Sequence, residues 1–468
     1  MILDPPSPVR RPGIFLCATA RAPTYSRMGA SVRRVWIVAP HFPPSNLASV
    51  HRARLLANHL AEQGWEARVL AAAPAFYEER PDPDLVCLVD PSVRVVHVGA
   101  LPQRWTRPFG LGDLGIRAWW PMLRVLRAAA ARGEVDVLHI TIPPNYPALL
   151  GRALWSSHRV PYCVDYIDPW VPESDLGARP FSKLGVSLAL ARTLEPFAVA
   201  RASGLAGITP GYFEGVLRRN PRLRGTPTLA CQYGASRRDA EAAAASDVRP
   251  RRLVRDDPAA QIVYAGALLP KAHAPMRALL RALARHNAAA RRPLRLVLLG
   301  TGRAPEDPAG YQVAPLAREE DAAEWVREYP ERHPYLEVLA TLAAADGIAV
   351  VGSTEPHYSP SKLFQAVLAR RPVFALLHEQ SEAAALLRES GAGIAVTFGS
   401  EPDLGALSAR IEDALRDWPP AAAPEPRGET FAAHDAAEVA RRFAAFYEQM
   451  IARAKTKPLR RPRSLHER

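Results

Sequence analysis

The sequence is poor in the features that crosslink a chain or carry it through a membrane. Its four cysteines are scattered, with no Cys-x-x-Cys pair and no histidine at metal-ligand spacing; they are Cys17, Cys87, Cys163 and Cys231. We therefore expect neither a disulfide framework nor a structural zinc, and the cysteine usage indicates a reduced, cytoplasmic compartment. No run of about 18 apolar residues occurs either, so the sequence predicts no membrane-spanning helix.

Acidic residues are the scarcer charged class, with 47 Asp and Glu against 60 Lys and Arg, which gives a formal net charge of +13. Most of the excess lies at the ends: residues 453–468 hold seven basic and one acidic side chain, and the Pro-rich residues 1–30 hold four arginines and one aspartate. We expect both ends to be disordered, with Met28 as an alternative start, and no signal peptide, because no sufficiently long apolar segment follows the arginines. The body of the chain is only mildly basic, so no specific nucleic acid is expected, although such ends can contact an anionic membrane or RNA.

What the sequence does contain is one pattern of elements, used twice. A length of 468 residues exceeds the usual size of one domain. In the first half, a strand pattern at 35–39 is followed by a Pro-rich loop, an amphipathic helix at 48–63 and another strand at 66–70. This β-loop-α-β order returns after residue 255, where strands are predicted at 261–265, 294–299, 348–351 and 373–377. We predict an α/β protein of two doubly wound, Rossmann-like sheets, with a ligand cleft at the carboxyl ends of the strands.

The segment 359–375 indicates what that cleft binds. It follows an apolar strand and a short polar loop, and Ser359 and Pro360 suit the start of a helix that ends before Pro372. A strand, a polar loop and a helix start place free backbone N–H groups at the edge of a sheet, where Lys362 adds a positive charge. This arrangement favours a phosphate group, and therefore a nucleotide-diphosphate site.

Several separated motifs then resemble the GT-B glycosyltransferases, specifically family 4, over residues 35–450. The first is Pro-His-Phe-Pro-Pro-Ser at 40–45, ahead of an arginine-bearing helix. Two segments resemble the acceptor side of the family: residues 135–144, and Val-Pro-Tyr-Cys-Val-Asp-Tyr-Ile-Asp-Pro-Trp at 160–170. Two short motifs resemble the elements that lead into the family's linker: Thr-Pro-Gly at 209–211 and Gln-Tyr-Gly at 232–234. Three more resemble its donor side: Tyr-Ala-Gly at 264–266, Leu-Gly-Thr-Gly at 299–302 and the segment 359–373.

The resemblance implies a domain plan and a reaction. The plan is a disordered head (1–30), an N-terminal acceptor domain (31–225), a linker (226–256), a C-terminal nucleotide-sugar donor domain (257–430), a helix that crosses back (431–452) and a basic disordered tail (453–468). The reaction is metal-independent hexosyl transfer from a nucleotide-diphosphate sugar to a glycan or lipid-linked acceptor, with retention at the anomeric carbon. We expect no cofactor, and we expect the setting to be polysaccharide or glycolipid assembly in the cytoplasm, with peripheral contact to the inner face of the plasma membrane.

Particular residues are assigned to these roles. Lys271, Lys362 and the N–H groups around residues 359–361 would stabilise the departing nucleoside diphosphate in place of a metal ion. The full set of predicted site residues is Asp168 and His139 for catalysis, Gly266, Lys271, Gly300, Glu355, His357, Ser359, Ser361, Lys362 and Gln365 for the donor, Pro44, Ser45 and Asn46 for the acceptor-side loop, and none for a metal.

The sequence also departs from the family. Two glutamates usually stand eight positions apart around the donor loop, and here His357 and Gln365 occupy those positions. Gln365 can still hydrogen bond a ribose hydroxyl, as a neutral amide. The departure motivates an alternative, a catalytically weakened partner or nucleotide-binding subunit of a polysaccharide pathway; another GT-B chemistry, sugar-nucleotide epimerisation, is a third hypothesis.

Each candidate residue also has an ordinary structural interpretation. Asp168 is either a general base for the acceptor hydroxyl or a helix cap ahead of Pro169. His139 is either a cleft residue or a satisfied histidine of an apolar strand. Lys362 is either a phosphate ligand or a solvated helix residue, although a cation in the first turn is unfavourable unless an anion is present.

Two further stretches remain open between functional and structural interpretations. Asp-Pro-Asp at 82–84 resembles a metal-binding pair, but no strand precedes it, so a solvated loop is the favoured interpretation. Residues 104–132 mix tryptophans with arginines in an amphipathic pattern. Such a stretch suits either a membrane interface or an ordinary helix with an arginine-lined outer face.

Overall fold

Seven strands form one parallel sheet in the N-terminal half of the computed structural model. The structure describes residues 32–107, 112–172, 179, 181–302, 307, 309–356, 358–420 and 431–456. The strand order is β3-β2-β1-β4-β5-β6-β7. These strands are β1 (Arg33–Val38), β2 (Trp65–Ala72), β3 (Arg94–Val98), β4 (Val137–Ile142), β5 (Tyr162–Tyr166), β6 (Gly204–Gly207) and β7 (Thr228–Ala230).

Helices cover both faces of this sheet, which is why its central strands are continuous apolar runs rather than alternating ones. The helices of this half are α1 (Ala48–Leu60), α2 (Gln103–Thr106), α3 (Leu114–Arg117), α4 (Trp119–Ala131), α5 (Ala148–His158), α6 (Lys183–Val199) and α7 (Gly211–Arg219). On one face, α4, α5 and α6 pack into a core with Val38 and Ile140. On the other face, α1 packs against the opposite side chains of the same strands, such as Val35 and Ile37.

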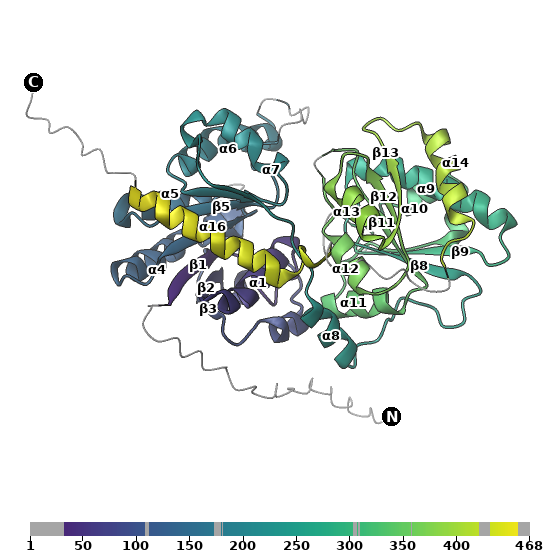
Figure 1. Cartoon of the computed structure of the whole chain (residues 1–468), viewed down its shortest axis with the longest axis horizontal. Helices are drawn as coiled ribbons and strands as arrows, with labels where there is room; N and C mark the ends of the chain where they lie inside the picture. The colour runs from purple at the N-terminus through teal and green to yellow at the C-terminus, as the bar shows by residue number, and fades with distance from the viewer. Residues whose placement is uncertain are drawn as a thin grey trace, which may run out of the picture. The chain divides into compact units, whose positions relative to one another are not determined.

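The last helix of the chain, α16 (Ala436–Thr456), returns to this second face. Its Phe443 and Tyr447 are buried among Val35, Ile37 and residues of α1. Figure 1 shows α16 lying along α1, across the N-terminal sheet. The helix that was predicted to cross back is therefore present, and it extends four residues into the segment 453–468 that was expected to be a disordered tail.

Six strands form the parallel sheet of the C-terminal half, in the order β10-β9-β8-β11-β12-β13. They are β8 (Ala260–Ala265), β9 (Leu294–Leu299), β10 (Val326–Tyr329), β11 (Gly347–Val351), β12 (Val373–His378) and β13 (Gly393–Phe398). Their helices are α9 (His273–Ala289), α10 (Ala314–Glu319), α11 (Tyr335–Ala344), α12 (Lys362–Leu368), α13 (Glu382–Ser390) and α14 (Leu404–Leu415). One face packs on α9 and α14, and the other packs on α11, α12 and α13. The predicted fold of two doubly wound sheets is thereby confirmed.

Two local expectations differ from the structure. The helix predicted from Ser359 begins at Lys362, so Ser359 and Pro360 lie in the loop ahead of it and Ser361 is the N-cap. The stretch predicted as a linker, 226–256, contains β7, which completes the N-terminal sheet, and α8 (Arg237–Ala245). Short 3-10 turns connect other elements: η1 (Ala61–Gln63), η2 (Pro74–Phe76), η3 (Pro83–Leu88), η5 (Pro221–Leu223), η6 (Pro270–Ala272) and η7 (Ala323–Trp325).

Candidate active site

A cavity of about 330 Å³ lies where loops at the carboxyl ends of strands from both sheets meet. Asp168 follows β5 and Ile208 follows β6, whereas Gly266 follows β8 and Gly300 follows β9. Carboxyl-end crevices are the usual ligand sites of doubly wound sheets. The cavity brings together the predicted residues Asn46, Asp168, Gly266, Gly300, Ser359, Ser361, Lys362 and Gln365.

Lys362 places a cation on the cavity wall that the C-terminal half supplies. Its Nζ donates a hydrogen bond of 2.5 Å to the Tyr264 hydroxyl and lies 4.0 Å from the centroid of that ring. Among the described residues, no carboxylate lies within ion-pair distance of it. Burial without a counter-charge lowers the pKa of Lys362 from 10.5 to about 7. The amine is therefore set to gain from an anion in the cavity.

Gly266 lets the backbone pass close to this amine. Its φ is +123°, a conformation that side chains rarely tolerate, and a Cβ at this position would lie 3.3 Å from both Cε and Nζ of Lys362. Ser359 and Ser361 line the same wall, and the Ser361 side chain makes no capping bond to α12. Gln365, one helical turn after Lys362, lies close enough to the Tyr335 hydroxyl to hydrogen bond with it.

The opposite wall combines one carboxylate with aromatic residues. Asp168 reaches solvent at the cavity, yet burial of its carboxyl group raises its pKa to about 6. Tyr212, Tyr233 and Tyr358 lie around it, and burial together with the Asp168 charge raises the pKa of all three hydroxyls. The residues 169–172 that follow form bends rather than a helix, so Asp168 does not cap a helix starting at Pro169.

Sequence reasoning missed the residues that join the two walls. His51 of α1 stacks near Tyr335 of α11, with ring centroids 4.4 Å apart, and its Nε2 is 3.1 Å from Asn46 Oδ1. Burial and the nearby Arg54 charge lower the pKa of His51 to about 3, so the ring is neutral. The arginine-bearing helix was recognised in the sequence, but no pattern there pairs a helix residue with one nearly 300 positions later.

Several predicted site residues are not brought to the cavity. His139 is fully buried beneath α16, where its Nδ1 is 2.9 Å from the Tyr447 hydroxyl and its Nε2 is 3.5 Å from Asp165 Oδ2. This placement matches the structural interpretation of a histidine packed inside an apolar strand, and His139 does not line the cavity. The reason is topological: His139 points to the face of β4 that α16 covers, a contact that the sequence of β4 does not encode.

Lys271 and Glu355 were both predicted to bind the donor, and in the structure they bind each other. Lys271 Nζ is 2.6 Å from Glu355 Oε1, and neither residue lines the cavity. Lys271 is also largely exposed. Of the two predicted phosphate-binding lysines, Lys362 lines the cavity, and the part of the chain that the structure describes places no carboxylate at ion-pair distance from it. His357, a further predicted donor residue, lies outside the described residues.

The acceptor-side loop is held in place by buried polar contacts. Of its three predicted residues, only Asn46 lines the cavity; Ser45 hydrogen bonds to Glu79, and Pro44 follows a cis peptide bond. The Asn46 amide donates to Asp82 Oδ2 at 3.1 Å and to the His333 carbonyl at 3.0 Å. Asp82 was expected to lie in a solvated loop, but it is buried because it also accepts the Tyr335 N–H at 2.7 Å.

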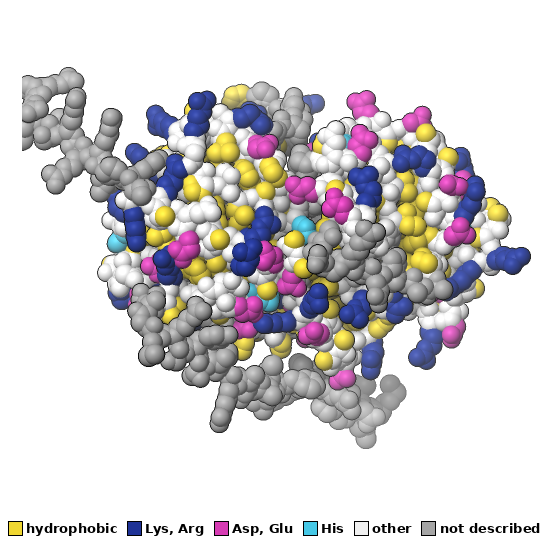
Figure 2. Space-filling model, in the orientation of Figure 1, with side chains coloured by type: hydrophobic (Ala, Val, Ile, Leu, Met, Phe, Trp, Pro, Cys, Tyr) yellow, Lys and Arg dark blue, Asp and Glu magenta, His cyan; other side chains and the backbone are white. Residues whose placement is uncertain are grey.

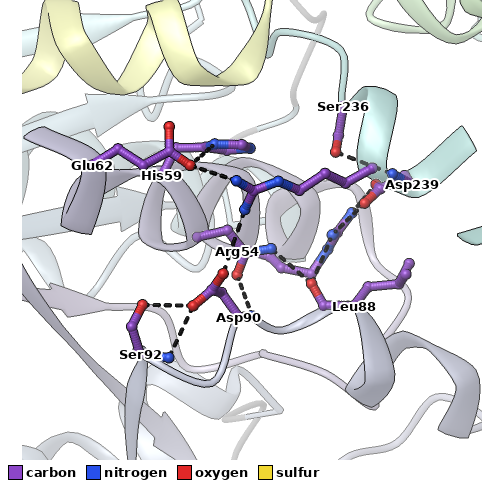
Figure 3. A network of polar contacts seen from close by, with 10 residues as sticks. Arg54, His59, Glu62, Leu88, Asp90, Ser92, Ser236 and Asp239 are labelled. Carbon is purple, nitrogen blue, oxygen red and sulfur yellow. Dashed lines mark hydrogen bonds and ion pairs between the residues drawn. The ribbon is translucent and has the colours of Figure 1, made fainter. Parts of the chain in front are cut away.

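Two buried arginines of α1 fix this side of the cavity. Arg52 makes a bidentate ion pair with Asp165 of β5, at 2.8 and 3.2 Å. Arg54 makes another with Asp239 of α8, at 2.9 and 2.5 Å, and Figure 3 shows it crossing from α1 to Asp239 beside the Leu88 carbonyl. Paired planar charges of this kind impose a single geometry, so they fix the orientation of α1 and with it the position of His51.

The stretch 104–132 divides between the two interpretations left open. In α4, Met122 and Leu123 are buried against the sheet, as in an ordinary helix. Trp105 and Trp120, in contrast, are exposed.

Within the described ranges, no helix combines the length and the hydrophobicity needed to cross a bilayer, and no cluster of three or more His, Cys, Asp or Glu is placed to hold a metal ion.

The fold of two doubly wound sheets that meet at one cavity is the GT-B fold, and solved structures share it. The sucrose-phosphate synthase of Thermosynechococcus elongatus is similar over 90% of this chain and 97% of its own, at 15% identity and a TM-score of 0.52. The alpha,alpha-trehalose 6-phosphate synthase of Burkholderia multivorans is similar over 92% of this chain and 100% of its own, at 13% identity and a TM-score of 0.57. Anabaena HepE, solved in complex with UDP and glucose, is similar over 90% of this chain and 99% of its own, at 17% identity and a TM-score of 0.50.

Residues 48–226 match the family model described as a glycosyl transferase 4-like domain. No curated protein matches the chain in sequence. The family match over residues 48–226 and the fold agree with the predicted resemblance and with the predicted enzyme class, a glycosyltransferase.

Proposed function

We propose that the protein transfers a hexosyl group from a nucleotide-diphosphate sugar to a glycan or lipid-linked acceptor. The observation that carries this proposal is Lys362: a cation to which the described residues offer no carboxylate partner, in a cavity whose opposite wall holds Asp168. The two walls are chemically different. A cationic wall suits the leaving diphosphate, and a wall with a carboxylate suits the incoming hydroxyl.

On the donor wall, the ammonium of Lys362 and the backbone beside Gly266 hold the diphosphate. As the bond to the anomeric carbon breaks, negative charge grows on the leaving phosphate oxygen, and a preorganised cation in a poorly solvated cavity stabilises that charge. This role supports a metal-independent reaction. Ser359 and Ser361 supply further hydroxyl donors, and Gln365 hydrogen bonds a ribose hydroxyl.

On the acceptor wall, Asp168 accepts a hydrogen bond from the acceptor hydroxyl and takes its proton. Its pKa of about 6 makes it ionised, and still basic, at neutral pH. Tyr212 and Tyr233 of this wall, with Tyr358 from the C-terminal half, offer aromatic faces and hydroxyl groups to a sugar ring. We propose retention at the anomeric carbon, which the family resemblance supports and which the configuration of the product tests.

UDP-hexoses are the first donors to test. Anabaena HepE was solved with UDP and glucose, and the Burkholderia and Thermosynechococcus proteins are synthases of sugar phosphates. We place the reaction in polysaccharide or glycolipid assembly, in the cytoplasm at the inner face of the plasma membrane. The exposed Trp105 and Trp120, with Arg124 and Arg127 on the outer face of α4, support peripheral membrane contact.

The test measures release of nucleoside diphosphate from a panel of sugar nucleotides, with membrane extract as the source of acceptor. We expect release from one donor class by the native chain and a loss of at least about tenfold in Lys362→Ala, since charge-assisted hydrogen bonds contribute about 1.5–3 kcal/mol. Equal release by the two proteins refutes the role of Lys362. Donor binding in calorimetry without any turnover favours the alternative of a catalytically weakened partner subunit.

A further inference from the structure

The exposed charged side chains on the helices α4, α5 and α6 are all basic. The three helices pack side by side over one face of the N-terminal sheet. Glu195 is the one acidic residue in their sequences, and it is buried with an Arg219 nitrogen 2.6 Å from its carboxylate. The face that carries α16 differs, because basic and acidic side chains are interspersed over it (Figure 2).

An exposed apolar stripe runs along α6. Val186, Leu190 and Phe197 recur at helical spacing on its outer side, and 47%, 46% and 56% of their surfaces are exposed. Phe181, just before the helix, is 95% exposed. Such a stripe costs free energy in water and normally marks a contact surface.

Beside this stripe, three arginines surround one tryptophan. The guanidinium carbons of Arg159, Arg201 and Arg152 lie 4.2, 5.0 and 5.6 Å from the centroid of the Trp155 ring. Arg152 also lies over Phe197, at 5.4 Å, and this joins the cluster to the stripe on α6. Its Nε and Nη1 are buried without a hydrogen-bond partner, and the described residues place no carboxylate within ion-pair distance of any of the three arginines.

We propose that this surface, α5 and α6 with the Arg152–Arg159–Arg201 cluster, docks on an anionic phospholipid bilayer. The stripe on α6 enters the boundary between headgroups and acyl chains, and the guanidinium groups of Arg159 and Arg201, which are both exposed, bind lipid phosphates. Charge complementarity between the basic side chains and the anionic headgroups favours a bilayer as the partner of this surface. A second copy of the chain would oppose one basic surface to another, which is repulsive. The inference rests on the peripheral membrane contact of the proposed function, and it names the face and residues responsible.

The test is co-sedimentation of the full chain with vesicles of phosphatidylcholine, with and without phosphatidylglycerol. Each basic residue at an anionic surface is worth about a fivefold change in binding, so Arg159→Gln with Arg201→Gln should weaken binding about 25-fold. Leu190→Glu with Phe197→Glu should abolish it. Controls of matched chemistry lie in the C-terminal half: Arg388→Gln with Arg410→Gln, and Val254→Glu, all at exposed positions, should bind as the native chain does.

Calorimetry with a sugar nucleotide, done without vesicles, reports separately on folding and on the donor site. Native-like donor binding by every variant, together with vesicle binding lost only in the α5–α6 variants, supports the proposal. The proposal is overturned if the native chain ignores anionic vesicles, if all variants bind them equally, or if Leu190→Glu with Phe197→Glu changes the oligomeric state instead. None of these outcomes affects the donor-site assignment, which the calorimetry tests by itself.

Discussion

Donor binding should draw a proton onto Lys362. The amine has a pKa of about 7 in the empty cavity, so at pH 7 about half of the molecules carry it uncharged. A bound diphosphate places negative charge next to it and raises its pKa again. A sugar nucleotide is the appropriate ligand, because its phosphates are diesters that do not titrate near neutral pH.

The expected magnitudes follow from this pKa. Binding at pH 8 should take up about 0.9 proton per ligand, and binding at pH 6 about 0.1. Affinity should therefore fall about tenfold from pH 6 to pH 8. Calorimetry in buffers of different ionisation enthalpy measures both quantities. Lys362→Met should lose the proton uptake and the pH dependence together, and it should bind about 10- to 100-fold more weakly at pH 6.

Lys271→Met is the matched control. Lys271 is exposed and already paired with Glu355, so its loss should change affinity by less than about fivefold and leave the proton uptake intact.

The pH dependence of the free energy of unfolding gives an independent check on the pKa of Lys362. Because burial lowers the folded pKa of Lys362, the fold binds that proton less tightly than the unfolded chain, and stability should rise as the pH increases from about 7 towards 10.5. Proton uptake that persists in Lys362→Met would refute the reasoning.

Three further changes test the acceptor wall and its support. Asp168→Asn should remove the acidic limb of the kcat/KM profile, which in the native enzyme falls as the pH drops through about 6; an unchanged profile in rate assays contradicts the base role. Arg52→Met leaves Asp165 buried without its partner and should lower the free energy of unfolding in urea by about 3–5 kcal/mol. His139→Gln should lower the midpoint of thermal unfolding but preserve the kcat of the folded enzyme, whereas a loss of kcat with normal donor binding would return His139 to a catalytic role.

The fold was accessible from sequence because its strands are buried on both faces. Parallel strands such as β1 and β12 read as unbroken apolar runs, and each is followed by a loop and an amphipathic helix. Elements without that signature were missed. β7 has only three residues and no buried one, and α8 is rich in alanine, so neither stood out from the polar sequence around it.

The site was accessible only in part, because sequence identifies residue types and not their partners. Lys271 and Lys362 both lie near loops that follow strands, and nothing local distinguishes them. The pairing of Lys271 with Glu355 joins positions 84 residues apart, and it is the contact that separates their roles. In the same way, only the packing of α16 over β4 reveals that His139 faces Tyr447 rather than the cavity.

The geometry also explains why α1 carries two buried arginines that do not line the cavity. Asn46 and His51 belong to the loop and helix that approach the donor half, through the His333 carbonyl and the Tyr335 ring. A loop is mobile unless buried contacts hold it, and a misplacement of about 1 Å at a reacting centre can cost about 100-fold in rate. Arg52 and Arg54 anchor this helix to β5 and α8 with planar ion pairs that accept a single orientation. In the proposed function, these two pairs act on catalysis through position, by setting the distance between the wall proposed to hold the donor and the wall proposed to activate the acceptor.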